Sequence, residues 1–199
     1  MKIENLVYNI PMKQRGAFIA NIIFSAPGII IHEFSHELFC VLSNVKVFKV
    51  KYFQLKNPAG YVEHAQPRNF IQAFFISVGP FIFGTLLSFG LFTFVLMFIQ
   101  KIYFGFLPLS IYNAILIPIA LWFGFSISLG CFPSNGDAHV LLMEANRHLF
   151  QRFNPFAIFL YPFVIIIKLA NGLQKFYFDY IYSIIILGLA VYTVLFLLK

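Results

Sequence analysis

Two histidines separated by three residues, in the segment His32-Glu33-Phe34-Ser35-His36, form the pattern in this sequence that points most directly to chemistry. On a helix, residues i and i+4 project from the same face, so both imidazoles can reach one metal ion, and imidazole nitrogens are common ligands of Zn²⁺. Glu33 lies beside the first histidine, where its carboxylate can accept a proton from a metal-bound water that attacks a carbonyl carbon. The pattern predicts a site for one zinc ion, with His32 and His36 as ligands and Glu33 as the catalytic base.

A purely structural interpretation of the same residues is also open. A polar patch can pair two membrane helices, and polar side chains at the end of a span can reach the lipid headgroups. Ionisable groups inside an apolar span are costly, however, and usually mark a functional site. Helix pairing seldom needs two histidines and a glutamate at this spacing, so the metal-site interpretation is favoured.

Zinc in a catalytic site needs a third protein ligand and one open position. The sequence offers Asp137, at the end of Pro133-Ser134-Asn135-Gly136-Asp137, where Pro, Asn and Gly break the preceding helix. His139 is an alternative ligand two residues further along. Ser134 or Asp137 could instead simply cap a helix predicted over 138–150, because both residue types are common N-caps. Asp137 is the predicted third ligand, with these alternatives open.

Three further residues could lie near a metal but have simpler interpretations. His64 could line a substrate entrance or be an ordinary loop histidine, and His148 is expected to be solvated on an amphipathic surface helix. Cys40 lies four residues after His36, and a buried, unreactive thiol is its expected state. The two cysteines of the chain make no disulfide framework.

The composition indicates that these residues lie in a membrane protein. Of 199 residues, 60% are hydrophobic and 11% are charged, against about 45–50% and about 25% in soluble domains. Crossing a bilayer takes about 20 mostly apolar residues in a helix, and backbone groups in lipid must be paired internally. The sequence predicts an all-α transmembrane helical bundle of about five spans, over 17–43, 70–99, 110–131, 155–170 and 180–198.

The segment 45–65 differs from the spans. Valines and aromatic residues are interleaved with lysines, and Asn57-Pro58-Ala59-Gly60 supplies a turn. The pattern predicts a small β hairpin at the membrane surface, after the first span. The first apolar run is too long for the core of a signal peptide, so the first span is expected to be retained. Residues 1–199 are expected to form a single integral membrane domain.

Basic residues lie mainly in the segments between the predicted spans. The net charge of +7 therefore indicates membrane-flanking charge rather than a nucleic-acid partner. Lys and Arg are slightly more numerous on the side that holds 44–69, 132–154 and the carboxyl end, which favours a cytoplasmic location for that side. The sequence predicts a multi-pass protein of the cell membrane whose active site opens toward the cytoplasm.

The order of these elements resembles the site-2 protease family of intramembrane metalloproteases. In that family an H-E-x-x-H motif in one transmembrane helix is followed by β strands, and an aspartate from another helix completes the zinc site. The matching pieces are His32 to His36, the hairpin with Gly60-Tyr61-Val62, the element Ser77-Val78-Gly79-Pro80, and Asp137. The resemblance covers roughly 17–138, about two-thirds of the chain.

Several departures separate this sequence from the family pattern. The family's Gly-Pro element commonly ends in Asn, whereas Phe83 stands there. Asp137 is flanked by Gly136 and Ala138 instead of lying in Leu-Asp-Gly, a version that resembles compact, divergent prokaryotic relatives. Asn135 is a candidate to replace the missing amide. No segment resembles a PDZ or CBS regulatory domain.

The resemblance implies hydrolysis of a peptide bond in or near a transmembrane segment of a membrane protein substrate. One alternative is a membrane metalloenzyme that acts on another amide or peptide at the membrane surface. A second is a non-catalytic metal-binding membrane protein such as a transporter, although the duplicated halves typical of broken-helix transporters are not seen in the sequence. The substrate and the oligomeric state are left open.

Overall fold

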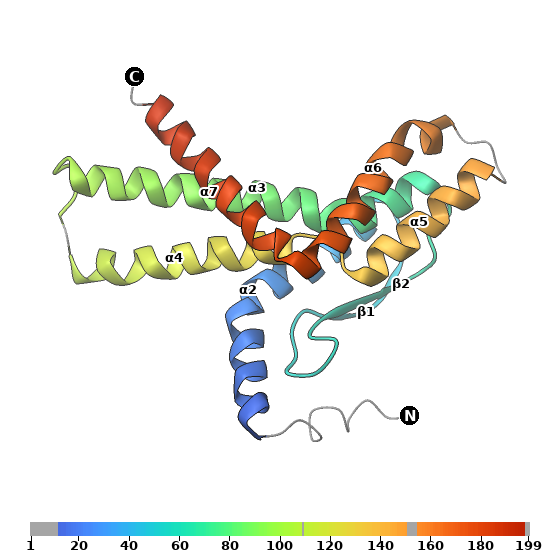
Figure 1. Cartoon of the computed structure of the whole chain (residues 1–199), viewed down its shortest axis with the longest axis horizontal. Helices are drawn as coiled ribbons and strands as arrows, with labels where there is room; N and C mark the ends of the chain where they lie inside the picture. The colour runs from blue at the N-terminus through green and yellow to red at the C-terminus, as the bar shows by residue number, and fades with distance from the viewer. Residues whose placement is uncertain (1–11, 109, 151–154, 198–199) are drawn as a thin grey trace.

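The computed structural model describes residues 12–108, 110–150 and 155–197, and most of them are helical (Figure 1). One two-stranded sheet follows the first described helix. This confirms the predicted all-α bundle with a small β hairpin after its first helix. The elements are α2 (Met12–Leu42), β1 (Val47–Lys51), β2 (Tyr61–His64), α3 (Phe70–Tyr103), α4 (Ile111–Gly130), α5 (Asn135–Phe150), α6 (Pro155–Leu173), the 3₁₀ helix η1 (Gln174–Phe176) and α7 (Phe178–Phe196).

Four helical segments within the described ranges are long and apolar enough to cross a membrane: Phe70–Tyr103, Ile111–Leu149, Pro155–Phe176 and Phe178–Phe196. The remaining predicted span, 17–43, lies in α2, which is a helix of 31 residues but is not among these four. Its C-terminal half carries four ionisable side chains, His32, Glu33, His36 and Glu37. The chain has the architecture of an integral, multi-pass membrane protein.

Helices α3 and α4 run antiparallel and side by side, and α7 crosses them (Figure 1). Their common core contains Phe92 of α3 with Ile186 and Ala190 of α7. An N-cap side chain precedes both α3 and α4: Asn69 before α3 and Ser110 before α4 each accept a backbone N–H of the first turn. These contacts form the frame against which α2 packs.

Pro27 interrupts the hydrogen bonding of α2, and α4 satisfies the neighbouring backbone groups. Proline has no N–H. The Gly28 N–H donates to Ser126 Oγ at 2.9 Å, and the Phe24 carbonyl accepts from Trp122 Nε1 at 2.9 Å. A Cβ on Gly28 would lie 2.0 Å from the Ser126 carbonyl oxygen, so a glycine is needed for this close approach. The contact holds α2 against α4 one turn before the predicted zinc ligands.

Strands β1 and β2 pair antiparallel, with Val50 opposite Val62. The base of the hairpin is anchored between α2 and α3 by a buried cluster of Cys40, Val45 and Ile76. The Val45 N–H donates to the Cys40 carbonyl at 2.8 Å, which turns the chain directly from the end of α2 into the hairpin. The hairpin is therefore fixed beside the C-terminal half of α2.

Helices α5 and α6 pack side by side, beside the N-terminal part of α3 (Figure 1). Leu141 and Ala145 of α5 meet Ala157 and Val164 of α6 in a buried cluster. The small side chains of Ala145 and Ala157 let the two helices approach closely. This packing sets the direction of α5, whose first turn carries the predicted third ligand.

Candidate metal centre

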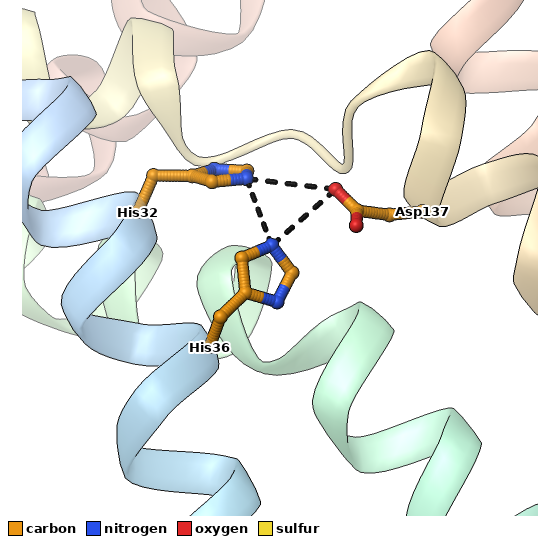
Figure 2. A group of neighbouring side chains, drawn as sticks. All are labelled: His32, His36 and Asp137. Atoms are coloured by element: carbon orange, nitrogen blue, oxygen red, sulfur yellow. Dashed lines mark hydrogen bonds and ion pairs between the residues drawn. The ribbon is translucent and has the colours of Figure 1, made fainter. Parts of the chain in front are cut away.

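Two histidines of α2 and an aspartate of α5 meet at one point (Figure 2). The Nε2 atoms of His32 and His36 are 3.1 Å apart. Asp137 Oδ2 lies 3.6 Å from His32 Nε2 and 3.4 Å from His36 Nε2. In the part of the chain that the structure describes, no other group of three His, Cys, Asp or Glu side chains is close enough to share a metal ion. The structure thus brings together the three residues that the sequence predicts as ligands.

Both imidazole rings are oriented by backbone carbonyl groups. His32 Nδ1 is 2.8 Å from the Gly130 carbonyl oxygen, and His36 Nδ1 is 2.9 Å from that of Ile76. A carbonyl oxygen can only accept, so each Nδ1 carries the proton and donates it. The Nε2 atoms are then the lone-pair nitrogens of the neutral rings. Hydrogen bonds of this kind fix the ring orientation of metal-binding histidines.

These two carbonyl oxygens are available because neither has a partner in its own helix. Ile76 lies four residues before Pro80, which has no N–H to donate to it. Gly130 is the last residue of α4, and the last carbonyls of a helix have no partner within that helix. Pro80 thus leaves the Ile76 carbonyl free to orient His36, and the end of α4 leaves the Gly130 carbonyl free to orient His32.

The three candidate ligand atoms have the chemistry and spacing that a tetrahedral zinc ion requires. With both Nδ1 protons committed, the two Nε2 lone pairs and the Asp137 carboxylate are three acceptors that face one another, and they repel unless a proton or a cation lies between them. Ligand atoms bonded to zinc at about 2.0–2.1 Å in a tetrahedron are about 3.3 Å apart. The three separations, 3.1, 3.4 and 3.6 Å, lie on both sides of this value. Two imidazoles and one carboxylate leave a fourth position for water or substrate, as in catalytic zinc sites.

Asp137 also caps its own helix. Its Oδ2 accepts a hydrogen bond from the Ser134 N–H at 2.9 Å, and Ser134 Oγ accepts one from the Asp137 N–H at 3.2 Å. This reciprocal pair closes the N-terminus of α5, which begins at Asn135 rather than at the predicted residue 138. The two sequence interpretations of Asp137 are therefore compatible, because the cap holds the carboxylate toward the histidines.

A pocket of about 450 Å³ opens beside the three ligand atoms, and Glu33 lines it together with them. Gly60 of the hairpin packs directly on Glu33, since a Cβ on Gly60 would lie 2.6 Å from Glu33 Cγ. The absence of a side chain at residue 60 lets the hairpin approach the helix and confine the glutamate. Glu33 is thus placed in the pocket where a metal-bound water would lie.

The hairpin forms one wall of the pocket. Residues 57–62 line it, and Tyr52 donates a hydrogen bond to Glu37 of α2. The same hydrogen bond raises the pKa of Tyr52 above its usual range, so the phenol keeps the proton that it donates. The hairpin is tied to the helical turn that carries His36.

The other candidate residues lie in different environments. His64 lines the same pocket, and its Nδ1 donates to a backbone carbonyl at 2.8 Å. His139 is exposed and lies outside the metal-binding group. His148 is buried, with its Nε2 3.7 Å from Glu144, so the expectation of a solvated histidine is wrong: α5 turns this side chain inward. Cys40 is buried in the hydrophobic cluster at the base of the hairpin, as expected.

The Ser77-Val78-Gly79-Pro80 element packs helices together. A Cβ on Gly79 would lie 2.2 Å from the ring of Phe39, so this glycine lets α3 approach α2. Phe83, which stands where the family commonly has Asn, packs on Phe34 with ring centroids 5.9 Å apart. The departure at residue 83 therefore replaces an amide with an apolar contact between α2 and α3.

A different amide lies in the pocket. Asn135, the predicted replacement, is exposed and is not one of the described residues that line the pocket. Asn57 lines it from the hairpin turn. In the sequence Asn57 carries only the signal of a turn residue, and nothing local indicates that this turn folds over α2. Asn57 is the residue of this site that sequence reasoning missed.

The comparisons with protein-family models, curated proteins and solved structures gave no match to this chain. Fold and site together define a class, an integral membrane protein with a His-His-Asp cluster suited to one metal ion.

Proposed function

We propose that this chain is an intramembrane zinc metalloprotease of the site-2 protease type, which hydrolyses a peptide bond in or near a transmembrane segment of a membrane protein. The observation that carries the proposal is the convergence of His32 Nε2, His36 Nε2 and Asp137 Oδ2, three acceptors whose separations suit one zinc ion. Glu33 in the same pocket favours a hydrolase over a protein that only stores or transports the metal.

When bound, zinc supplies a Lewis acid and lowers the pKa of its water from about 15.7 toward about 7. The protein's own side chains account for the remaining steps. Glu33 accepts the proton of the attacking water and then donates it to the leaving amine. Asn57 and His64 line the same pocket, where they are placed to form hydrogen bonds with the backbone of the substrate and orient the scissile carbonyl.

A helical substrate hides its carbonyl groups in its own hydrogen bonds, so it must unwind locally before it is cut. The hairpin is suited to hold the unwound segment, because each strand of a two-stranded sheet has one free edge. As a test of this hypothesis, Val50→Pro should lower cleavage and leave the zinc content unchanged; full cleavage by that variant would refute the role of the hairpin. The charge balance of the loops favours an opening toward the cytoplasm, in the cell membrane.

The decisive experiment compares the wild type with Glu33→Gln, both reconstituted in lipid nanodiscs with a single-span reporter protein. We expect about one zinc per chain in both proteins, measured by mass spectrometry of the metal, and cleavage by the wild type alone. Glu37→Gln is the matched control, because this neighbouring carboxylate bonds to Tyr52 instead of lining the pocket. Equal cleavage by wild type and Glu33→Gln, or no zinc in the wild type, would refute the proposal.

The third ligand is tested separately with Asp137→Asn and His139→Ala. Asn can still accept the Ser134 N–H and cap α5, so the fold is kept while the ligand charge is removed. We expect zinc to be lost from Asp137→Asn and kept by His139→Ala. The opposite result would move the third ligand to His139.

A further inference from the structure

A second polar pocket, of about 190 Å³, lies between the loop that precedes α3 and the C-terminal half of α5. It is separate from the metal centre, since the two pockets share no lining residue. Most of its lining side chains carry hydrogen-bond donors. The lining residues are Gln66, Pro67, Arg68, Glu144, Arg147 and His148.

The acidic side chain of this pocket is already surrounded by donors. Glu144 Oε1 lies 3.6 Å from Arg147 Nη1 and 3.5 Å from Gln66 Nε2, and Glu144 Oε2 lies 3.7 Å from His148 Nε2. One carboxylate thus faces three donor side chains. Arginine is protonated at any physiological pH, so the charge of Arg147 alone offsets that of Glu144.

Arg68 adds a positive charge that no described neighbour neutralises. Its backbone N–H donates to Gln72 Oε1 at 2.8 Å. Its guanidinium has no hydrogen bond or ion pair within the described ranges. The pocket therefore has a surplus of donors and an excess positive charge, which suits an anion with several acceptor oxygens.

The surroundings of the pocket suit a ligand with an apolar part. Arg68 precedes α3, a segment long and apolar enough to cross a membrane, so it lies at the level where headgroups are found. Ile71, in the first turn of α3, is 38% exposed, and Met143, one turn before Arg147 on α5, is 53% exposed. Exposed apolar side chains thus lie next to residues of the charged pocket in the chain.

A neighbouring pocket extends the charged region. It has a volume of about 440 Å³, shares Gln66 and Arg68 with the first, and is also lined by Lys46. The added lysine raises the positive charge, and the added space can hold the glycerol part of a headgroup. Both features favour a phospholipid whose headgroup carries net negative charge.

We propose that the pocket around Arg68 and Arg147 binds a phosphate group presented by an anionic phospholipid of the surrounding membrane. The planar guanidinium of arginine matches two phosphate oxygens at once. Arg68, which has no competing partner among the described residues, makes the main contact, and Arg147 shares its charge between Glu144 and the ligand. The acyl chains lie along Ile71 and Met143.

The first arm of the test measures lipid retention on the full chain by native mass spectrometry. The protein is exchanged into dioleoylphosphatidylglycerol or dioleoylphosphatidylcholine, as wild type, Arg68→Gln, Arg147→Gln and Lys101→Gln. We expect the wild type to retain the anionic lipid and Arg68→Gln to lose it roughly tenfold, the effect of one charge-assisted hydrogen bond. Lys101→Gln removes the same charge at the opposite end of α3 and should retain the lipid like the wild type.

The second arm distinguishes a lipid from free phosphate. Thermal unfolding in detergent is followed in sodium phosphate and in sodium chloride of equal ionic strength. A phosphate-specific stabilisation that Arg68→Gln abolishes, without lipid retention in the first arm, would keep the anion site and assign it to free phosphate. Equal lipid loss in Arg68→Gln and Lys101→Gln, or no effect of Arg68→Gln in either arm, would overturn the proposal.

Discussion

The two ends of α5 carry two polar clusters of opposite hydrogen-bonding character. At its first turn, Asp137 faces the Nε2 atoms of two imidazole rings whose protons are on Nδ1, so three acceptors converge. Near its C-terminal end, Glu144 faces an amide, a guanidinium and an imidazole, so donors are in surplus. Both clusters contain a carboxylate and a histidine, and the composition alone does not separate them.

The difference is set by what lies behind each histidine. At the metal centre, backbone carbonyls take the Nδ1 protons of His32 and His36, and this forces the Nε2 lone pairs toward the carboxylate. His148 instead lies beside Phe70, with ring centroids 6.0 Å apart, and directs Nε2 at Glu144. Converging acceptors call for a cation, whereas surplus donors call for an anion.

The largest effect should come from removing one of the converging acceptors. His36→Ala is expected to lose its zinc and reduce cleavage to background, because two ligands cannot hold the ion as three do. His148→Ala, the histidine of the other cluster, should keep its zinc. The measurement is zinc per chain after purification. Equal losses of zinc in the two variants would contradict the claim that only the cluster around Asp137 binds the metal.

The next effect tests the placement of the base rather than the metal. Gly60→Ala puts a Cβ 2.6 Å from Glu33 Cγ, so the glutamate or the hairpin must move. A displacement near 1 Å in a catalytic group costs about a hundredfold in rate, and we expect kcat to fall by about that factor with zinc retained. Gly90→Ala, where a Cβ meets nothing within 4 Å, is the control. Loss of zinc in Gly60→Ala would place residue 60 in the metal site itself.

A smaller effect tests the carbonyl behind His36. Pro80→Ala gives α3 an N–H that competes for the Ile76 carbonyl and weakens its hydrogen bond to the imidazole. Loss of such an orienting partner lowers metal affinity by about tenfold or more, which a competition titration with a zinc chelator measures. Pro118→Ala in α4 is the control, because Pro118 lies in another helix and does not line the pocket. Unchanged affinity in Pro80→Ala would mean that ring orientation does not depend on the released carbonyl.

The smallest effect should come from the second cluster. Glu144→Gln keeps an acceptor for Gln66 and removes one ion-pair charge beside Arg147, whose side chain is 43% exposed. Partly exposed pairs contribute about 1 kcal/mol or less, so thermal stability should change little and zinc content should not change. Retention of the anionic lipid should rise, since the pocket becomes more positive. A fall in retention would show that Glu144 orients the arginines rather than opposing the ligand.

Part of this arrangement could be predicted from sequence because it depends on local periodicity. Apolar runs give the spans, and the valines with a turn give the hairpin. The i, i+4 spacing puts His32 and His36 on one face of α2. Asp137 could be singled out because it follows a helix-breaking segment on the same side of the membrane as the histidines.

The rest depends on contacts between distant parts of the chain, which local patterns do not encode. The Gly130 carbonyl that orients His32 is 98 residues away, and a backbone atom leaves no residue type to recognise. Asn57 and Gly60 have the composition of any turn, and their approach to Glu33 depends on how the hairpin folds over α2. Only the free Ile76 carbonyl could have been recognised from sequence, because Pro80 lies four residues later and has no N–H to donate to it.

The geometry of the candidate metal centre depends on the close contact of α2 with α4. A Cβ on Gly130 would lie 3.0 Å from the carbonyl carbon of Gly28, so the two main chains touch where α4 ends, and the Gly130 oxygen orients His32. Neither helix can tilt or slide against the other without moving that oxygen. The affinity proposed for zinc would therefore depend on how closely these two helices pack in the bilayer.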